Sequence, residues 1–212
     1  MLKFDHLAVI APTLEDGVAH VRACLGMDMP TGGQHPQMGT HNRLMRLGDD
    51  AFLEVIALDP SAPKPAHPRW FGLDDRDGVR SAWDAGRRLR GWVARTTDIA
   101  GILAAHGDVL GDQTQVSRGD RSWDFAVCPD GALPADGVAP PVIDWGQRGT
   151  PAPDMPDVGA HLVSFQLEHP DPAGVRRLYE MLDVLDPPEV TQGADMCYRA
   201  QIQTPNGLKT LV

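Results

Sequence analysis

The sequence lacks the features that mark several common classes of protein. Its three cysteines, Cys24, Cys128 and Cys197, are far apart and form no CxxC pair, which argues against a disulfide framework or a zinc knuckle and indicates reduced thiols. The 19 Lys and Arg are outnumbered by 29 Asp and Glu, and the net charge of -10 opposes binding to nucleic acids and anionic membranes. There is neither a run of about eighteen apolar residues nor a signal-type N-terminus. We therefore expect a soluble, cytoplasmic protein.

The chain does contain enough apolar sequence for a core. Hydrophobic residues make up 42% of its 212 residues, which suits one compact domain or a few small fused modules. Residues 4–11 form an apolar run typical of a strand. The hydroxyl of Thr13, followed by acidic residues, then predicts a helix over 14–25 that ends at Gly26.

Two short strands are predicted after this helix. The segment 30–39 is too rich in Gly and Pro for a regular element, so we expect a loop or an irregular strand there. The apolar segments 42–47 and 51–58 follow as strands, joined by a hairpin-type turn at 48–50. Residues 59–78 hold four Pro and many charges, which predicts a stiff linker.

The same order of elements then returns. After the linker we expect a strand at 89–96, a helix at 98–105 and strands at 122–127 and 142–145. A strand at 161–167, a helix at 172–182 and a hairpin within 198–212 then follow. Weak repetition of this kind favours small modules that share one sheet system. We accordingly expect one compact domain with four parts. The first module covers 1–58, a linker or excursion covers 59–88, the second module covers 89–147, and a partial third unit covers 160–212.

Two ionisable side chains lie on apolar strands far apart in the sequence. His6 follows Asp5 in the first strand, and Glu54 lies within the apolar run 52–56. An imidazole or a carboxylate on a buried strand needs a partner, because burying it alone is costly. The pattern therefore predicts a pocket in which the two groups meet each other, a metal ion or a bound ligand. A purely structural, hydrogen-bonded pair is the competing interpretation.

Alternation along the strands predicts that both groups face inward. His6 shares a face with Phe4 and Ala8 on its strand, while Glu54 shares one with Phe52 and Ile56. Each polar group is thus embedded in an apolar side that must be buried. We expect both side chains to line one cavity.

Several segments together resemble a known family. Phe-Asp-His-Leu-Ala-Val at 4–9, the Gly-rich segment 32–42 and Phe-Leu-Glu-Val-Ile at 52–56 are similar to the glyoxalase-like domain of the vicinal oxygen chelate superfamily, and 141–145 and 169–172 are similar to its second half. The resemblance implies an α+β fold in which βαβββ modules form a curved, incomplete mixed β-barrel around a cavity, with the helices outside. It also implies a divalent metal held by the first and fourth strands of each module.

The resemblance carries over to particular residues. His6 and Glu54 stand where the family places ligands on the first and fourth strands of the first module. The later modules supply no histidine to match His6, so two equal halves of a four-ligand site are not expected. Asp144 matches Glu54 and is the candidate third ligand, on the opposite wall of the cavity; its competing role is a cap or pair at a strand end. Imidazole and carboxylate ligands suit Zn, Mn, Fe, Ni or Co.

Further residues are candidates for contact with a substrate. His35 and His41 lie in or beside the Gly-rich segment and can reach the cavity, although loop imidazoles are usually solvated. The amide of Asn42 can bind a substrate carbonyl at the cavity edge or simply hold the loop. Glu54 is the candidate group for moving a proton, with Asn42 beside it.

Two classes of function follow. The first is a metal-assisted lyase, isomerase or ring-cleaving dioxygenase that acts on a small oxygenated metabolite. The second is a metal-free protein of the same fold that binds or sequesters a small molecule. The pair of His6 and Glu54 favours the first class, because sequestration needs no ligand-type residues. The missing second histidine favours the second. In both, the partner is a small molecule, and the shared sheets make a homodimer reasonable.

Overall fold

The computed structural model describes residues 1–212 and opens with a strand, a helix and three further strands. These elements are β1 (Leu2–Ile10), α1 (Leu14–Leu25), β2 (Thr31–His35), β3 (Thr40–Arg46) and β4 (Phe52–Leu58). The helix has the predicted bounds because both caps form. The Thr13 hydroxyl accepts a hydrogen bond from the Asp16 amide, and Gly26 adopts a left-handed conformation. The first half of the Gly-rich segment 30–39 forms the regular strand β2, since β3 pairs with each of its residues, and 36–39 form the turn between the two strands.

The connection after β4 contains more structure than the predicted linker. It forms a short 3-10 turn, η1 (Trp70–Gly72), and the helix α2 (Arg76–Asp84), whose N-terminus is capped by the Asp75 carboxylate. Hydrogen bonds from side chains thus stabilise a segment whose prolines suggested only stiffness. The sequence signal that could have revealed α2 is the Asp75 cap ahead of Val79 and Trp83.

A second copy of the first arrangement follows this connection. Its elements are β5 (Leu89–Arg95), α3 (Ile99–Leu110), β6 (Asp112–Arg118), β7 (Arg121–Val127) and β8 (Val142–Asp144). β6 was not predicted, and α3 continues beyond the predicted range of 98–105. The helix ends at Gly111, which has a φ of 91° and leaves no room for a Cβ atom against the Val127 carbonyl.

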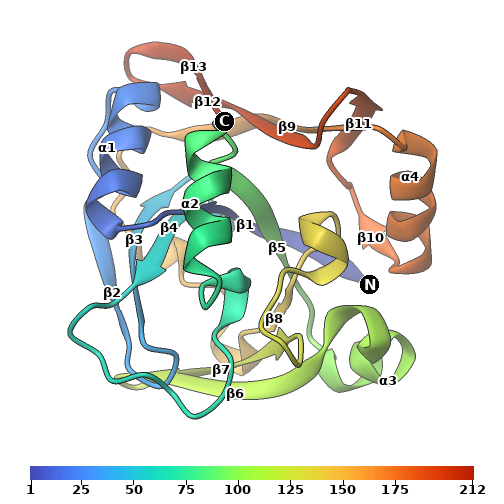
Figure 1. The fold of residues 1–212 in the computed structure, drawn as a ribbon. Coiled ribbons are helices and arrows are strands. Elements are labelled where there is room, and N and C mark those ends of the chain that lie inside the picture. Colours follow the sequence, from blue (N-terminus) through green and yellow to red (C-terminus); the bar gives the residue numbers. More distant parts are fainter.

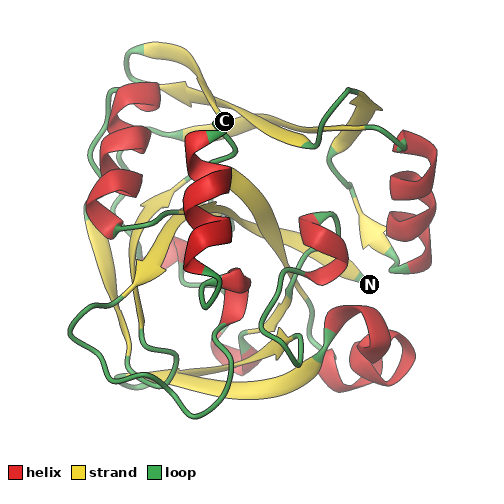
Figure 2. Cartoon of the chain, in the orientation of Figure 1, coloured by secondary structure: helices red, strands yellow, loops and turns green.

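The two copies form one large curved sheet (Figure 1). Eight strands run in the order β2-β3-β4-β1-β5-β8-β7-β6. The sheet curls into a nearly closed barrel, and the helices lie outside it (Figure 2). The edge strands β2 and β6 approach each other without backbone pairing; we call this gap the seam. The predicted α+β fold with an incomplete barrel is confirmed.

The last part of the chain forms a separate sheet rather than joining the shared one. After β9 (His161–His169), α4 (Pro172–Met181) and β10 (Val184–Leu185), three strands complete it: β11 (Glu189–Gln192), β12 (Cys197–Thr204) and β13 (Gly207–Leu211). The order is β11-β9-β12-β13, and only β10 joins the large sheet, by pairing with β1. The reason is that β4 and β5 already occupy both sides of most of β1.

A pseudo-twofold axis relates the two copies. β1 and β5 are antiparallel, β4 is parallel to β1, and β8 is parallel to β5. Leu7 lies opposite Trp92 in the sheet. The number of residues from Leu7 to Trp92 equals the number from Thr13 to Asp98, the caps of the two equivalent helices. Each central strand also carries one bulge. The axis therefore passes through the pair of Leu7 and Trp92.

The large sheet separates two hydrophobic cores. The larger one lies on the convex side, where Leu7 and Trp92 pack with the helices and with Tyr198 and Ile202 of the second sheet. The smaller one fills the concave side and contains many aromatic residues. Polar groups that face the concave side are thus surrounded by apolar side chains, which decides the properties of the site.

Candidate functional site

A small cavity of about 30 Å³ lies within the concave core, which is room for about one or two water molecules. Side chains from both copies and from η1 line it. Its polar members, which come from β1, β2, β3, β4 and β6, are His6, His35, Asn42, Glu54 and Arg118. Apolar and aromatic side chains form the rest of the wall, so charges in the cavity are poorly shielded by solvent.

His6 enters the cavity because of a bulge in β1. Phe4 pairs with Ala94 and His6 with Val93, so Asp5 is the extra residue between them. The bulge places Phe4 on the convex side, where it stacks on Trp92, and His6 on the concave side. The expectation that His6 and Phe4 share a face was therefore wrong, because simple alternation fails at a bulge.

Asp5 fixes the imidazole ring of His6. Its Oδ1 lies 2.7 Å from Nδ1 of His6, and its Oδ2 accepts a hydrogen bond of 3.0 Å from the indole of Trp145. Arg95 lies 3.5 Å from the same carboxylate, which is fully buried. The ring also stacks on Phe52, with 4.3 Å between the centroids. Nδ1 is thus occupied, and Nε2 is the atom left for the cavity.

Glu54 faces His6 across the cavity. Its Oε2 lies 3.3 Å from Nε2 of His6, without the alignment of a hydrogen bond, so this nitrogen is buried with no hydrogen-bond partner. Its Oε1 accepts a hydrogen bond of 2.7 Å from the amide of Asn42. Asn42 is held in turn, because its Oδ1 accepts from the backbone N–H of Gly33. The structure therefore brings His6, Glu54 and Asn42 together.

Burial and pairing act in opposite directions on both ionisable groups. Desolvation lowers the pKa of His6, but the contacts with Asp5 and Glu54 outweigh it and raise the pKa to about 9. Desolvation raises the pKa of Glu54, but His6 and Asn42 outweigh it and hold the pKa below its usual value. At neutral pH the two groups form an ion pair of imidazolium and carboxylate.

His35 also lies in the cavity, but as a neutral ring. Burial lowers its pKa to about 4. Its Nδ1 lies 3.1 Å from the hydroxyl of Thr40, which also accepts from the indole of Trp70. Its Nε2 lies 3.4 Å from the amide nitrogen of Asn42, which can only donate. The proton of His35 is therefore on Nδ1, and Nε2 acts as the acceptor.

The turn η1 covers the cavity with two aromatic rings. Trp70 packs on His35 and Phe125, and Phe71 packs on Phe125 as well. Phe71 has a φ of 59°, a left-handed conformation that a bulky side chain rarely adopts. The amide of Gly72 donates to the Gly131 carbonyl at 2.8 Å and so ties the cover to the loop after β7.

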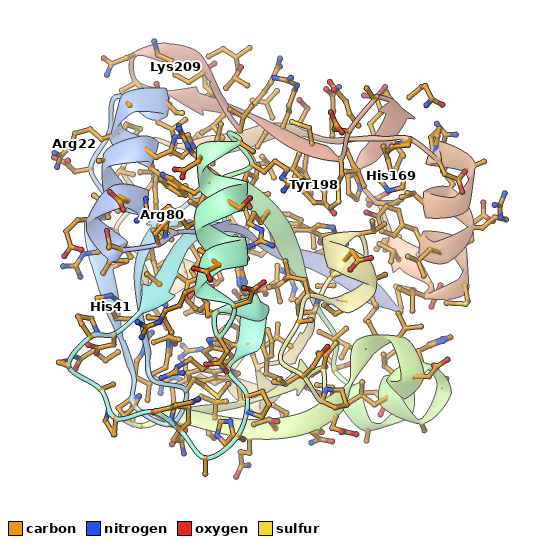
Figure 3. All side chains as sticks on the ribbon, in the orientation of Figure 1. Arg22, His41, Arg80, His169, Tyr198 and Lys209 are labelled. Atoms are coloured by element: carbon orange, nitrogen blue, oxygen red, sulfur yellow. The ribbon has the colours of Figure 1, made fainter.

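Two of the predicted site residues lie outside the cavity. Asp144 accepts a hydrogen bond from the amide of Gly146 at the end of β8, while its neighbour Ile143 faces the cavity. His41 points away from its neighbour Asn42 and lines a different cleft, with Arg80 of α2 (Figure 3). Alternation along β3 and β8 explains both placements.

The residues present suit part of a metal site. Two ligands that each lie about 2.1 Å from one ion are about 3 Å apart, which the 3.3 Å between His6 and Glu54 allows. Asp5 supports the ring as carboxylates do behind metal-bound histidines. With Asp144 directed elsewhere, no group of three His, Cys, Asp or Glu side chains is arranged so that it could hold a metal ion. An ion would therefore have two protein ligands, with the other positions left to substrate or water.

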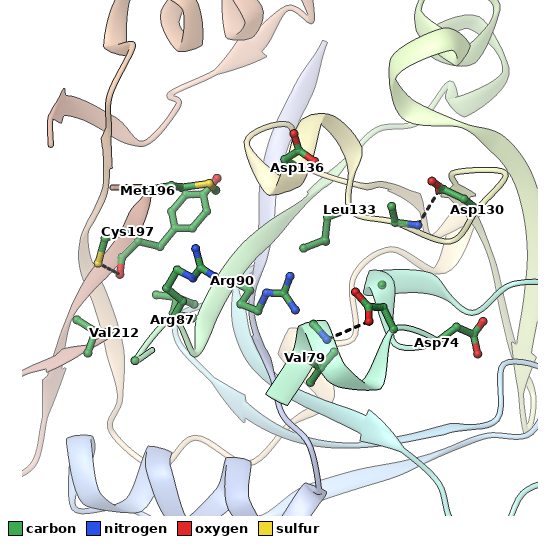
Figure 4. Close-up of a pocket in the computed structure, with 17 residues that line it drawn as sticks. Asp74, Val79, Arg87, Arg90, Asp130, Leu133, Asp136, Met196, Cys197 and Val212 are labelled. Atoms are coloured by element: carbon green, nitrogen blue, oxygen red, sulfur yellow. Dashed lines mark hydrogen bonds between the residues drawn. The ribbon is translucent and has the colours of Figure 1, made fainter. Parts of the chain in front are cut away.

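A larger cleft of about 490 Å³ lies between α2, β5 and the C-terminal sheet (Figure 4). None of the predicted site residues lines it. Its charged residues have both signs: Arg87, Arg90, Asp74, Asp75, Asp130 and Asp136. Three of its carboxylates serve the backbone, since Asp74, Asp75 and Asp130 accept from the backbone amides of Arg69, Gly78 and Ala132 respectively. The cavity at His6 is therefore the better candidate for chemistry.

Two solved structures are similar to this chain, and the first of them supports the fold. A hypothetical protein from Staphylococcus aureus has a similar structure, with a TM-score of 0.54 and 12% identity over 97% of this chain and 82% of that chain. A methylmalonyl-CoA epimerase from Streptomyces coelicolor, in complex with 2-nitronate-propionyl-CoA, gives a TM-score of 0.43 and 13% identity over 68% of this chain and 95% of that chain.

No curated protein matches the sequence. In the structure, no helix has the length and apolar character that a membrane crossing requires. The family comparison, by contrast, covers most of the chain. Residues 4–182 match the glyoxalase-like domain, and the chain therefore belongs to this family.

Proposed function

We propose that this protein is an enzyme that moves a proton on a small oxygenated metabolite, as a lyase or an isomerase. The observation that carries the proposal is the contact of 3.3 Å between Nε2 of His6 and Oε2 of Glu54 inside an apolar cavity. An acid and a base with opposed protonation states, both buried, are the groups that proton transfer requires. A purely structural pair would not need a cavity beside it.

Each polar group has a role in this scheme. Glu54 takes a proton from a carbon next to a carbonyl group, and negative charge develops on the carbonyl oxygen. Nε2–H of His6 donates to that oxygen, since Asp5 holds the ring by its other nitrogen. Asn42 orients the Glu54 carboxylate through the 2.7 Å hydrogen bond. The apolar wall excludes water and strengthens these interactions.

A divalent ion would replace the His6 hydrogen bond in a second form of the same proposal, because Nε2 of His6 cannot carry a proton and bind an ion at once. His6 and Glu54 would hold it, and it would supply Lewis-acid stabilisation of a substrate oxygen, or redox chemistry if the reaction is a ring-cleaving dioxygenation. Calorimetry with Zn, Mn, Ni and Fe tests this part. We expect about one ion per chain for the wild type and weaker binding by Glu54→Gln, because few ligands can be spared. Equal, weak binding by both proteins would remove the ion.

The central experiment does not require a known substrate. Small 2-oxo and 2-hydroxy compounds are incubated with the protein in D₂O, and loss of the C–H signal is followed by NMR. We expect exchange with the wild type and a loss of about 100-fold or more with Glu54→Gln. Asp144→Asn is the matched control, since it changes a carboxylate outside the cavity. Exchange that Glu54→Gln leaves unchanged would contradict the proposal.

The second candidate is a metal-free protein that binds a small molecule. The aromatic wall favours it, because six rings surround the polar groups: Phe52, Trp70, Phe71, Trp123, Phe125 and Trp145. The incomplete ligand set favours it too. Stable binding of a compound without exchange or turnover would support this class over the enzyme.

The setting of the protein is also a proposal. We propose that it acts in the cytoplasm, where its three free cysteines stay reduced. We also propose that the protein is a homodimer. Light scattering after gel filtration would measure its mass.

A further inference from the structure

Arg118 is a polar residue of the cavity that the sequence did not single out. It is the last residue of the edge strand β6 and lies at the seam, opposite β2. A Cβ atom on Gly33 would be 2.9 Å from Nη1 and 3.2 Å from Cδ of Arg118, so the side chain lies directly against the β2 backbone. The Ser117 amide donates to Oε1 of Gln37 at 2.8 Å across the same seam. Arg118 thus crosses the seam toward the cavity.

One nitrogen of the Arg118 guanidinium is desolvated without compensation, while the side chain as a whole is half-buried. Its Nη1 is buried and has no hydrogen-bond partner, and no carboxylate lies within ion-pair distance of the side chain. Arg121, three residues further along the chain, shows the usual arrangement. It donates to the Gly149 carbonyl at 2.7 Å and to Asp154 at 2.8 Å. A guanidinium is always charged, and burying part of it without an acceptor is costly.

The two carboxylates of the site are already engaged elsewhere. Glu54 contacts His6 with one oxygen and Asn42 with the other. Asp5 contacts His6 with one oxygen and Trp145 with the other, and Arg95 lies beside it. Neither group reaches Arg118, so the cavity has a cation that lacks an anion.

We propose that the natural ligand carries a carboxylate and that Arg118 binds it, leaving the adjoining carbon beside Glu54 and His6. A planar carboxylate matches the fork of donors on a guanidinium. This inference names the substrate class of the proposed function. It rests on the proposed function for the reaction at the adjoining carbon, but not for the binding of the carboxylate. The binding of the anion is a separate, measurable property.

Acetate and acetamide are suitable probes, because they have the same shape and differ in charge, and each is only a carboxylate or an amide with one methyl group. Binding is followed at constant ionic strength by the fluorescence of the tryptophans around the cavity. We expect the wild type to bind acetate about 10-fold or more tightly than acetamide, and Arg118→Gln to lose this preference. Arg118→Lys should keep part of it, because the charge remains and the fork is lost.

Two further variants complete the experiment. Arg43→Gln removes an exposed guanidinium from β3 and should leave acetate binding unchanged. Gly33→Ala pushes the Arg118 side chain aside without changing any charge and should weaken acetate binding several-fold; it keeps the proposal testable if Arg118→Gln does not fold. Equal binding of the two probes, no acetate binding by the wild type, or unchanged binding by Arg118→Gln would each overturn the proposal. If the protein exchanges protons on uncharged compounds but not on carboxylates, the proposed function would stand and this inference would be wrong.

Discussion

The two copies within the large sheet have the same architecture and opposite chemistry. The first copy directs His6, Asn42 and Glu54 into the concave side. The second copy directs Ile143 and Phe125 there from its corresponding strands, and the axis relates His6 to Gly91, which has no side chain. One scaffold therefore supports the acid–base pair in one half and, apart from Arg118 at the seam, an apolar wall in the other.

This difference shows where the free energy of the site comes from. The charged groups of the first copy are stabilised by one another and, at Asp5, by Trp145 and Arg95 from the second half, whereas the apolar wall of the second copy gains from burial. The bulges illustrate the same division. Asp5 at the first bulge points to the cavity and holds His6, while Arg90 at the second lines the open cleft. Substitutions that weaken the ionic site of the first copy, or alter the apolar wall of the second, test this difference. The substitution with the largest expected effect comes first.

Breaking the ion pair should have the largest effect. Glu54→Leu leaves the His6 imidazolium buried without its partner, and we expect the free energy of unfolding at pH 7 to fall by about 3–5 kcal/mol. The double variant His6→Leu with Glu54→Leu makes the first copy apolar like the second, and it should recover at least half of that loss. Urea denaturation of the single and double variants measures the coupling. A double variant less stable than Glu54→Leu would refute the pairing.

Alkaline pH should weaken the first copy specifically. The pKa of His6 is about 9 in the folded protein against 6.5 ordinarily, so its stabilisation is complete below about pH 6.5 and is lost as the pH rises through 9. We expect a loss on the order of 3 kcal/mol over this range. Denaturation at pH 6, 7.5 and 9 gives the slope. The double variant lacks the titrating pair and should show a much flatter dependence.

Removing the support of the carboxylate should have an intermediate effect. Asn42→Ala deletes the donor to Glu54 and leaves the Gly33 amide without its acceptor, at a cost of about 1–3 kcal/mol. His41 lies on the same strand and points out of the cavity. We therefore expect His41→Ala to change the free energy of unfolding by less than about 0.5 kcal/mol. Thermal unfolding of the two variants compares them directly, and similar losses would argue against the role of Asn42.

The smallest effect is expected in the apolar copy. Ile143→Val removes one methylene group from the cavity wall and should cost about 0.5–1.5 kcal/mol, independently of pH. A pH-dependent loss would mean that the second copy shares in the ionic network, which would blur the contrast between the copies.

Local sequence signals accounted for much of the fold. The caps at Thr13 and Gly26 define α1, and the turn before Gly207 defines the last hairpin, because these residues act on their own neighbours. β2 and β6 were missed as regular strands because their pairing partners, and not their own residues, specify them. Propensity carries no information about such long-range pairing.

The site was predictable only in part for a similar reason. The pocket of His6 and Glu54 followed from polar groups on apolar strands, and the structure places them together. The bulge at Asp5 and the position of Arg118 depend on the register between distant strands. Alternation along β8 would have shown that Asp144 and Ile143 face opposite sides, but not which of them faces inward.

The strained backbone at Phe71 bears on the timing of ligand exchange. A bulky residue in the left-handed region costs on the order of 1–3 kcal/mol, which its packing on Trp70 and Phe125 offsets. Local opening of this turn would release the strain but would expose two buried rings to water. Because its ring closes the cavity, the rate of this opening, and not diffusion, would limit how fast a molecule enters. The residence time of a bound ligand would then follow the lifetime of the closed turn.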